Sequence, residues 1–380
     1  MKFVSRCSFC LLIFISCTRP TQPLTIDTPT DSLTKLKYAT GFQVRYDGQS
    51  KYVTVPAPYQ GATKGFTYLL VPNDVPVPAH EPNVRVITIP IQSIVCTSTS
   101  HIPLLDYLNE TQSLTGFPSL DYISSPRMRE RIDAGQVTEL GIDKGLNMER
   151  LVALNPGIVM GYAMSSDYGQ FKKIEELGIP VVINAEYLEN HPLGRAEWIK
   201  FVALFFNKEK QADSVFQLIE KTYLRLKDQT STTANRPTVM SGVVYGDTWF
   251  LPGGQNYAAQ LLKDAGCKYI WNDDLSKGYL ELSFEAVYQK AHQADLWIGV
   301  ASFTSLKEIK QTDVRYQRFK SFQTQQVYSY DARKGAKGGS EYLELGYMRP
   351  DLILRDLVQI AHPELASGDS LYFHRRLPPE

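Results

Sequence analysis

The fold is decided by two stretches of the sequence: Gly145-Leu-Asn-Met-Glu149-Arg-Leu-Val-Ala-Leu-Asn-Pro156-Gly-Ile-Val-Met160 and Tyr279-Leu-Glu-Leu-Ser-Phe-Glu285-Ala-Val-Tyr-Gln-Lys-Ala-His-Gln-Ala-Asp295-Leu-Trp-Ile298. Each predicts a short helix with a glutamate in its first turn, then a tight turn and a buried strand. A carboxylate there suits the positive end of the helix dipole. The two copies lie too far apart in the chain for a solenoid repeat. We therefore expect two similar α/β lobes, each presenting one surface glutamate.

The bulk composition sets the limits of the interpretation. The chain has 380 residues, no net charge and 43% hydrophobic residues. That length suits two domains of ordinary size with substantial cores. Phosphate binding needs a basic face, so the balanced charge argues against nucleic acid as a partner.

The N-terminus predicts a targeting segment. Lys2 and Arg6 are basic, and the apolar run Phe9 to Ile15 is too short to span a bilayer. The pattern resembles a lipoprotein signal, with a signal peptide at 1–16, lipidation of the Cys17 thiol and a flexible tether over 17–34. The alternative is an ordinary secretory signal.

The remaining chain predicts two lobes. Residues 35–90 alternate between apolar and polar residues, with glycine and proline between the runs, which is typical of strands and hairpins. From Ile91 onward, strands alternate with helices, which predicts parallel sheets covered on both faces. We expect strands at 91–98, 137–140, 158–162, 180–184, 238–245, 268–271, 296–300 and 326–330, and helices at 147–154, 168–177, 196–206, 254–265, 283–290 and 349–361.

A long helix is predicted to join the lobes. The apolar positions over residues 208–228 keep helical spacing, and such a helix would be roughly 30 Å long. We divide the chain into an N-terminal lobe (35–206), a linker helix (207–229) and a C-terminal lobe (230–380). The predicted fold class is α/β, with two doubly wound parallel-sheet lobes joined by one long rigid helix and a ligand cleft between them. Cys96 and Cys267, one per lobe, are expected to be small buried thiols.

Two motifs carry a family resemblance. Asn147-Met-Glu-Arg-Leu-Val-Ala-Leu-Asn-Pro156 and Leu282-Ser-Phe-Glu285 resemble the two glutamate motifs of the substrate-binding proteins of ABC importers for iron–siderophores, haem and cobalamin. The resemblance covers nearly all of the chain from Ile91 onward. It implies a monomeric, non-enzymatic protein that delivers a small metal chelate to permease and ATPase subunits. It also implies that Glu149 and Glu285 dock on arginines of the permease, although each could simply occupy a helix start.

Ligand residues are expected on loops at the carboxyl ends of the strands, facing the opposite lobe. The candidates on these loops are Ser98, Thr99, His101, Tyr162, Met164, Tyr245, Trp249, Tyr279 and Arg333. Trp249 is the main candidate because its loop is rich in glycine, aspartate and proline. Tyr162 and Tyr279 lie where the resemblance places cleft aromatics, which suit a flat macrocycle or catecholate chelate.

The charged candidates point to an anionic ligand. Arg333 suits the carboxylates of siderophores or the propionates of haem, and the alternative is that it belongs to a solvated, glycine-rich loop. His101 could ligate haem iron or cap its own helix, and no other direct metal ligand is expected, because the histidines form no close-spaced pair. We expect no catalytic cofactor. The predicted ligand is a ferric siderophore or haem, with cobalamin or another corrinoid as the alternative.

Two other classes of protein compete with this interpretation. An α/β enzyme is one, but the sequence contains no G-x-S-x-G, P-loop or G-x-G-x-x-G motif. A scavenger that works without a permease is the other. For the importer protein, the expected location is the periplasm of a Gram-negative bacterium, with the lipid in the outer face of the inner membrane.

Overall fold

The computed structural model describes residues 36–142, 145–164, 168–300, 303–365, 368 and 370–380. Internal contacts divide the chain into two units, residues 1–32 and residues 33–380. The predicted signal peptide, Cys17 and most of the tether fall in the first unit, and all of 1–35 lies outside the described residues. None of the helices in the described part of the chain combines the length and apolar composition that a membrane crossing requires.

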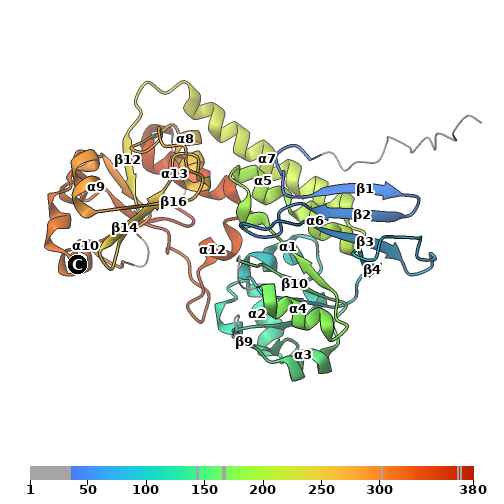
Figure 1. The fold of residues 1–380 in the computed structure, drawn as a ribbon. Helices are drawn as coiled ribbons and strands as arrows, with labels where there is room; N and C mark the ends of the chain where they lie inside the picture. The colour runs from blue at the N-terminus through green and yellow to red at the C-terminus, as the bar shows by residue number, and fades with distance from the viewer. Residues whose placement is uncertain (1–35, 143–144, 165–167, 301–302, 366–367, 369) are drawn as a thin grey trace, which may run out of the picture. The chain divides into compact units, whose positions relative to one another are not determined.

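The first sheet contains four strands in the order β1-β2-β3-β4 (Figure 1): β1 (Gln43–Asp47), β2 (Ser50–Val55), β3 (Phe66–Pro72) and β4 (Arg85–Ile89). The first three pair antiparallel, as the strand-and-hairpin pattern predicts. β4 is the exception, since it lies parallel to β3. Alternate residues such as Val44, Val53 and Leu70 are buried in the main core, which fixes the face of the sheet that packs inward.

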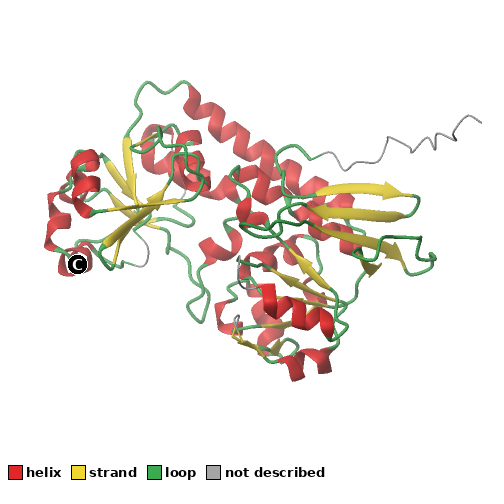
Figure 2. Ribbon diagram, viewed as in Figure 1, coloured by secondary structure: helices red, strands yellow, loops and turns green. Residues whose placement is uncertain are grey.

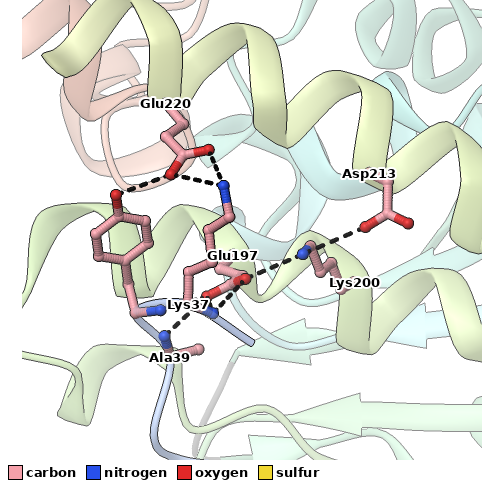
Figure 3. A network of polar contacts seen from close by, with 7 residues as sticks. Lys37, Ala39, Glu197, Lys200, Asp213 and Glu220 are labelled. Atoms are coloured by element: carbon pink, nitrogen blue, oxygen red, sulfur yellow. Dashed lines mark hydrogen bonds and ion pairs between the residues drawn. The ribbon is translucent and has the colours of Figure 1, made fainter. Parts of the chain in front are cut away.

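Charged side chains from the helices over residues 192–231 form hydrogen bonds and ion pairs with the first residues that the structure describes (Figure 3). The buried Glu197 carboxylate accepts hydrogen bonds from the backbone N–H groups of Lys37, at 3.0 Å, and Ala39, at 2.9 Å. The Lys200 ammonium lies 3.0 Å from Glu197 Oε1 and 3.2 Å from Asp213 Oδ1. A buried carboxylate is costly unless it is paired, and this network supplies its partners.

The N-terminal lobe is built on a parallel sheet in the order β11-β10-β5-β6-β7. Its strands are β5 (Ile94–Cys96), β6 (Leu114–Phe117), β7 (Thr138–Glu139), β10 (Ile158–Gly161) and β11 (Val181–Ile183). The connections contain α1 (Ile102–Tyr107), α2 (Pro126–Asp133), α3 (Met148–Leu154), α4 (Tyr168–Glu176) and the short pair β8 (Gly141–Ile142) and β9 (Gly145–Leu146). Figure 2 shows this alternation of helices and strands.

A helical segment follows the N-terminal lobe. The helix expected over 196–206 is divided into α5 (Pro192–Glu197), α6 (Ile199–Ala203) and a 3-10 turn (Leu204–Phe206). The chain turns at Asn207, whose φ is +55°. It continues as α7 (Glu209–Ser231), a helix of 23 residues where the sequence predicts the rod.

The C-terminal lobe has a second five-stranded sheet, in the order β15-β12-β17-β18-β19. Its strands are β12 (Thr238–Ser241), β15 (Lys268–Tyr269), β17 (Leu296–Ile298), β18 (Val327–Ser329) and β19 (Arg375–Arg376), of which only β19 runs antiparallel. The helices of this lobe are α8 (Tyr257–Asp264), α9 (Phe284–Ala291), α10 (Leu306–Thr312), α11 (Lys320–Gln323), α12 (Glu341–Leu345) and α13 (Pro350–Ala361).

A small antiparallel sheet in this lobe was not predicted. It consists of β13 (Val243–Tyr245), β14 (Thr248–Pro252) and β16 (Tyr279–Leu282). The strand expected over 238–245 breaks at Gly242, which has a φ of +82°. A Cβ there would lie 1.9 Å from the Phe250 carbonyl oxygen, so only glycine fits.

The predicted fold class is confirmed: two α/β lobes with parallel sheets are joined through the long helix α7. The two thiols, Cys96 and Cys267, are buried and neither forms a disulfide. Burial raises the pKa of Cys267 to about 12 and raises that of Cys96 further, so both remain neutral core groups.

Candidate functional site: a cleft cavity with an aromatic wall

A cavity with a volume of about 650 Å³ is lined by residues of both lobes. We call it the cleft cavity. The N-terminal side, with the first turn of the helical segment, contributes Gln60, Met164, Tyr187, Leu188, Asn190 and Arg195. The C-terminal lobe contributes residues of β13, β14, α8, β16, α12 and α13, together with the loops beside them. This volume lies in the range of small-molecule sites, which span roughly 300–1,000 Å³.

Six tyrosines form what we call the aromatic wall of the cleft cavity: Tyr187, Tyr257, Tyr279, Tyr330, Tyr342 and Tyr347. The rings of Tyr330 and Tyr342 are stacked, with centroids 4.7 Å apart. Those of Tyr257 and Tyr347 meet edge to face at 5.8 Å. Such rings offer large, rigid apolar surfaces with a polar tip, and they suit a flat or aromatic ligand.

Arg195 supplies positive charge to this wall. Its guanidinium carbon lies 4.0 Å from the Tyr257 ring centroid and 4.7 Å from that of Tyr347, so it stacks on two rings of the C-terminal lobe. Its Nε and Nη2 donate to the carbonyl oxygens of Glu189, at 3.0 Å, and Tyr187, at 2.9 Å. Lys277 also lines the cleft cavity, whereas no aspartate or glutamate does so among the described residues. The wall therefore favours an anion.

The hydroxyls of Tyr257, Tyr330 and Tyr347 in the wall remain protonated at neutral pH. Burial raises the pKa of Tyr257, Tyr330 and Tyr347 above the ordinary value. The Tyr257 hydroxyl is buried without a hydrogen-bond partner among the described residues. A buried donor without a partner is costly, so a ligand oxygen at this end of the cavity would be favourable.

Two of the predicted cleft residues line the cleft cavity. Met164, from the loop after β10, is 50% exposed, and Tyr279, at the start of β16, is 70% exposed. They come from different lobes. Tyr245 does not line the cavity but lies on the same face of the small sheet as Phe250, which does, since Tyr245 pairs with Thr248 two residues away.

The prediction for Trp249 is wrong. This residue is fully buried and lies in the core of the C-terminal lobe, against Trp297 with ring centroids 5.6 Å apart. Its indole N–H donates to the Ser241 carbonyl oxygen at 3.1 Å. Trp249 and Leu251 point inward from β14 while Phe250, between them, faces the cavity. The predicted loop is thus a strand, and its alternation buries the tryptophan.

The residues after β5 form a helix start rather than part of the cavity. The Ser98 hydroxyl accepts from the Ser100 N–H in the 3-10 turn Thr99–His101 that leads into α1. His101 is 1% exposed, and burial lowers its pKa to about 3. Because its ring is buried and does not line the cleft cavity, it cannot reach an iron complex there. Ser98, Thr99 and His101 are therefore corrected as cleft residues.

Tyr162 and Arg333 also lie outside the lining of the cleft cavity. Tyr162 meets Tyr187 edge to face, with centroids 5.8 Å apart, so it stands behind a residue of the aromatic wall. Arg333 is exposed and its guanidinium lies 4.2 Å from the Tyr372 ring centroid. The positive charge that the sequence reasoning assigned to Arg333 is supplied at the cavity by Arg195.

Both predicted docking glutamates are exposed in the first turn of a capped helix. Asn147 accepts from the Arg150 N–H at the start of α3, which carries Glu149. Ser283 accepts from the Ala286 N–H at the start of α9, which carries Glu285. Glu285 forms an ion pair with Arg315, at 2.9 Å, whereas Glu149 has no ion pair within the described residues.

Comparison with known proteins places the fold in a family. The profile of the family described as periplasmic binding protein matches residues 94–334, and the chain belongs to this family. An uncharacterized lipoprotein of Methanocaldococcus jannaschii is 28% identical over 362 residues, covering 89% of this chain and 84% of the relative.

Solved structures of similar fold come from solute-binding proteins. One is a "possible iron-binding (periplasmic solute-binding) protein" of Staphylococcus epidermidis, with a TM-score of 0.56, 15% identity and coverage of 72% of this chain and 99% of that one. Another is the periplasmic haem-binding protein RhuT of Roseiflexus in its apo form, with a TM-score of 0.54, 16% identity and coverage of 72% and 98%. At these identities the likeness establishes the fold alone.

Proposed function

We propose that this protein is the substrate-binding lipoprotein of an ABC importer, and that it captures an anionic iron chelate, a ferric siderophore or haem. The observation that supports this proposal is the cleft cavity, walled by six tyrosines and Arg195 and lined by no carboxylate among the described residues. The protein acts by binding and delivery, without catalysis. Its partners are the permease and the ATPase subunits of the importer.

The chemistry of the wall favours an iron chelate over a corrinoid. Ferric catecholates and haem combine flat apolar surface with negative charge, and carboxylate siderophores share the negative charge. Tyrosine rings match the first property, and the positive charge of the Arg195 guanidinium matches the second. Cobalamin would use the same rings but has less need of the charge of Arg195, so it is the second candidate. An enzyme or a permease-independent scavenger remains the alternative from another class.

The anchoring is part of the proposal. We infer that the thiol of Cys17 is lipidated and holds the protein at the outer face of the cytoplasmic membrane. The lipoprotein name of the Methanocaldococcus relative supports this reading. A Gram-negative periplasm, as the sequence analysis expects, stays a prediction, because that relative is archaeal.

Calorimetry tests the ligand. Residues 18–380 are titrated with haemin, with ferric catecholate, carboxylate and hydroxamate siderophores, and with cobalamin. Heat reports binding directly, whereas no tryptophan of the described residues lines the cavity. We expect saturable binding of one anionic chelate. Binding of cobalamin alone would establish the second candidate, and silence across all ligands would overturn the chelate proposal.

A matched pair of arginine variants then locates the ligand. Arg195→Gln keeps a polar side chain but removes the charge, and we expect chelate affinity to fall about 10- to 100-fold, the range of a charge-assisted hydrogen bond. Arg333→Gln removes the same charge outside the cavity and is expected to leave affinity unchanged. Equal effects of the two variants would show that the ligand does not contact Arg195.

A further inference from the structure

Residues 331–349, between β18 and α13, form a segment that we call the strap (Figure 1). Its first part is a tight loop, in which Lys334 bridges to Ser340 and the Gly335 N–H donates to the Gly339 carbonyl oxygen at 2.8 Å. The helix α12 follows, and it packs on α1 of the N-terminal lobe and on the turn before it. The strap thus belongs to the C-terminal lobe in sequence but lies against the other lobe.

The loop of the strap approaches the N-terminal lobe backbone to backbone. A Cβ on Gly339 would lie 2.0 Å from the Tyr122 carbonyl oxygen, and one on Gly335 would lie 2.7 Å from Ser124 Cα. No side chain fits at such distances, so the two glycines are required for this approach. The contact is therefore specific to the docked position of the strap.

Glu344 of α12 fastens the strap to the start of α2. Its Oε2 accepts from the Ser124 N–H at 2.6 Å and from the Ser124 hydroxyl at 2.7 Å, and its Oε1 accepts from the Ser125 N–H at 2.8 Å. The residue is 2% exposed. The Ser125 hydroxyl in turn donates to Asp106 Oδ2 at 2.5 Å. Three bonds to one buried carboxylate make this the best-connected polar contact between the strap and the N-terminal lobe.

The other side of the strap forms part of the aromatic wall. Tyr342, Leu343 and Tyr347 line the cleft cavity and flank Glu344 in sequence. Arg349 ends the strap, with its Nη1 2.7 Å from the Tyr107 hydroxyl and a bidentate pair to Asp351. The strap therefore carries both residues that line the cleft cavity and the contact to the opposite lobe.

We propose that Glu344 is a positioning residue: by fastening the strap to Ser124 and Ser125, it holds Tyr342 and Tyr347 in place in the wall of the cleft cavity. Ligand affinity then depends on a contact between Glu344 and two serines that the ligand does not touch. Loss of this contact lets the aromatic wall move. The hydrogen bonds of Glu344 to Ser124 and Ser125 are observed in the structure. Only their effect on ligand binding rests on the proposed function.

Amide hydrogen exchange tests the fastening without any ligand. Glu344→Gln places an amide NH₂ among donors and loses at least one acceptor. We expect exchange to accelerate about 10-fold or more in segment 118–130, which contains Ser124 and Ser125, and in segment 341–349, the wall side of the strap. Glu341→Gln, on the same helix, is the matched control, because its amide oxygen can still accept from the Tyr372 hydroxyl.

The outcomes of this experiment are distinct. Unchanged exchange in 118–130 overturns the fastening, and faster exchange there with unchanged 341–349 overturns the positioning role. If Glu344→Gln unfolds, Gly339→Ala tests the same contact from the loop and is expected to affect the same two segments. Gly169→Ala is its control, since a Cβ at Gly169 meets nothing within 4 Å.

A pH profile separates positioning from simple structural loss. Burial raises the pKa of Glu344 to about 7, so the docked strap binds a proton more tightly than the free strap. Protection of 118–130 in the wild type, corrected for intrinsic rates, is expected to be higher near pH 6 than near pH 8, and to be flat in Glu344→Gln. The other ionisable groups around this contact are His101, Asp106, Tyr107, Arg127 and Arg349. A sloping profile in the variant would contradict the role of Glu344.

Haemin then reports on the cavity. If the wild type binds haemin, Glu344→Gln is expected to bind it at least about 3-fold more weakly, while Glu341→Gln binds it equally well. Equal haemin affinity of Glu344→Gln and wild type overturns the positioning role. Binding of haemin by neither protein counts against haem in the proposed function, and hydrogen exchange then decides the strap alone.

Discussion

The two lobes share a plan but differ in what they bring to the cleft cavity. Each has a five-stranded, largely parallel sheet and a capped helix with an exposed glutamate. Five of the six wall tyrosines, however, come from the C-terminal lobe, namely Tyr257, Tyr279, Tyr330, Tyr342 and Tyr347. The N-terminal side supplies one tyrosine and the charge of Arg195. The two sides thus differ mainly in aromatic content, since each contributes a cation, Arg195 on the N-terminal side and Lys277 on the C-terminal side.

Three of these five tyrosines lie on two additions to the C-terminal lobe. The small sheet of β13, β14 and β16 carries Phe250 and Tyr279 on the face toward the cavity, and the strap carries Tyr342 and Tyr347. Neither addition belongs to the parallel sheet. A shared α/β frame can therefore carry cavity walls of unlike composition, because part of the wall lies on segments attached to the frame.

The largest expected effect separates the core of the C-terminal lobe from its wall. Trp249→Ala removes a fully buried ring from an aromatic cluster with Trp297, Tyr316 and Phe319, and we expect a loss of about 3–5 kcal/mol in the free energy of unfolding. Tyr245→Ala, on the same hairpin but 82% exposed, should cost less than about 0.5 kcal/mol. Urea unfolding followed by circular dichroism measures both. A small loss in the free energy of unfolding for Trp249→Ala would contradict its buried position and favour its assignment to the cleft.

The same hairpin shows how far sequence reasoning reaches. Long apolar periods identified most strands and helices, since burial of one face is recorded locally in residue spacing. The strand over residues 248–252 was missed because glycine, aspartate and proline around it indicated a loop. The alternation of Trp249 and Leu251 with Thr248 and Phe250 was the available signal for a strand.

The wall residues were mostly beyond sequence reasoning. Tyr279 and Met164 were found because they follow or begin recognisable elements. Arg195 and Tyr257 lie within different helices and come into contact only through tertiary packing. The guanidinium carbon lies 4.0 Å from the ring centroid. Nothing in local spacing records such a contact. The cluster of tyrosines over residues 342–347 was a signal, but its placement depends on the docking of Glu344 on Ser124.

The second prediction concerns pH and the contact between the lobes. Burial raises the pKa of Glu344 to about 7, outweighing the hydrogen bonds from Ser124 and Ser125, which lower it. An acid with a higher pKa in the folded state makes folding less favourable as pH rises from its unfolded value toward its folded one. We therefore expect the wild type to lose up to about 3 kcal/mol of stability, relative to Glu344→Gln, between about pH 4.5 and pH 7.

The comparison with Glu344→Gln removes the background of other groups. His101 acts in the opposite direction, because burial lowers its pKa to about 3 and stability falls as pH drops below 6.5. His101 is present in both proteins, so its contribution cancels in the difference. Urea midpoints at several pH values measure this difference. A difference that is independent of pH would show that folding leaves the pKa of Glu344 unchanged.

The smallest expected effect concerns the two glutamates, which look alike in sequence but differ in the structure. Arg315 already pairs with Glu285 and is itself held by Asp313, whose carboxylate lies 2.8 Å from Nη2. Glu149 has no such partner within the described residues. If both dock on arginines of a permease, Glu149 is ready to pair, whereas Glu285 must exchange one arginine for another. Each exposed pair contributes about 0–1 kcal/mol.

Substitutions at these positions test this asymmetry. We expect Glu149→Gln to weaken binding to the permease–ATPase complex in nanodiscs by up to about 5-fold, Glu285→Gln to weaken it less, and Arg315→Gln to strengthen it. All three effects should shrink as salt rises, because exposed charges are screened. Equal losses of affinity for the two glutamate variants, with no gain for Arg315→Gln, would mean that the ion pair between Arg315 and Glu285 does not compete with docking. Unchanged binding in every variant at low salt would show that the two glutamates are not part of a docking surface, and it would favour the scavenger alternative. The two exposed carboxylates would then interact only with the dipoles of their own helices, at whose capped starts they lie.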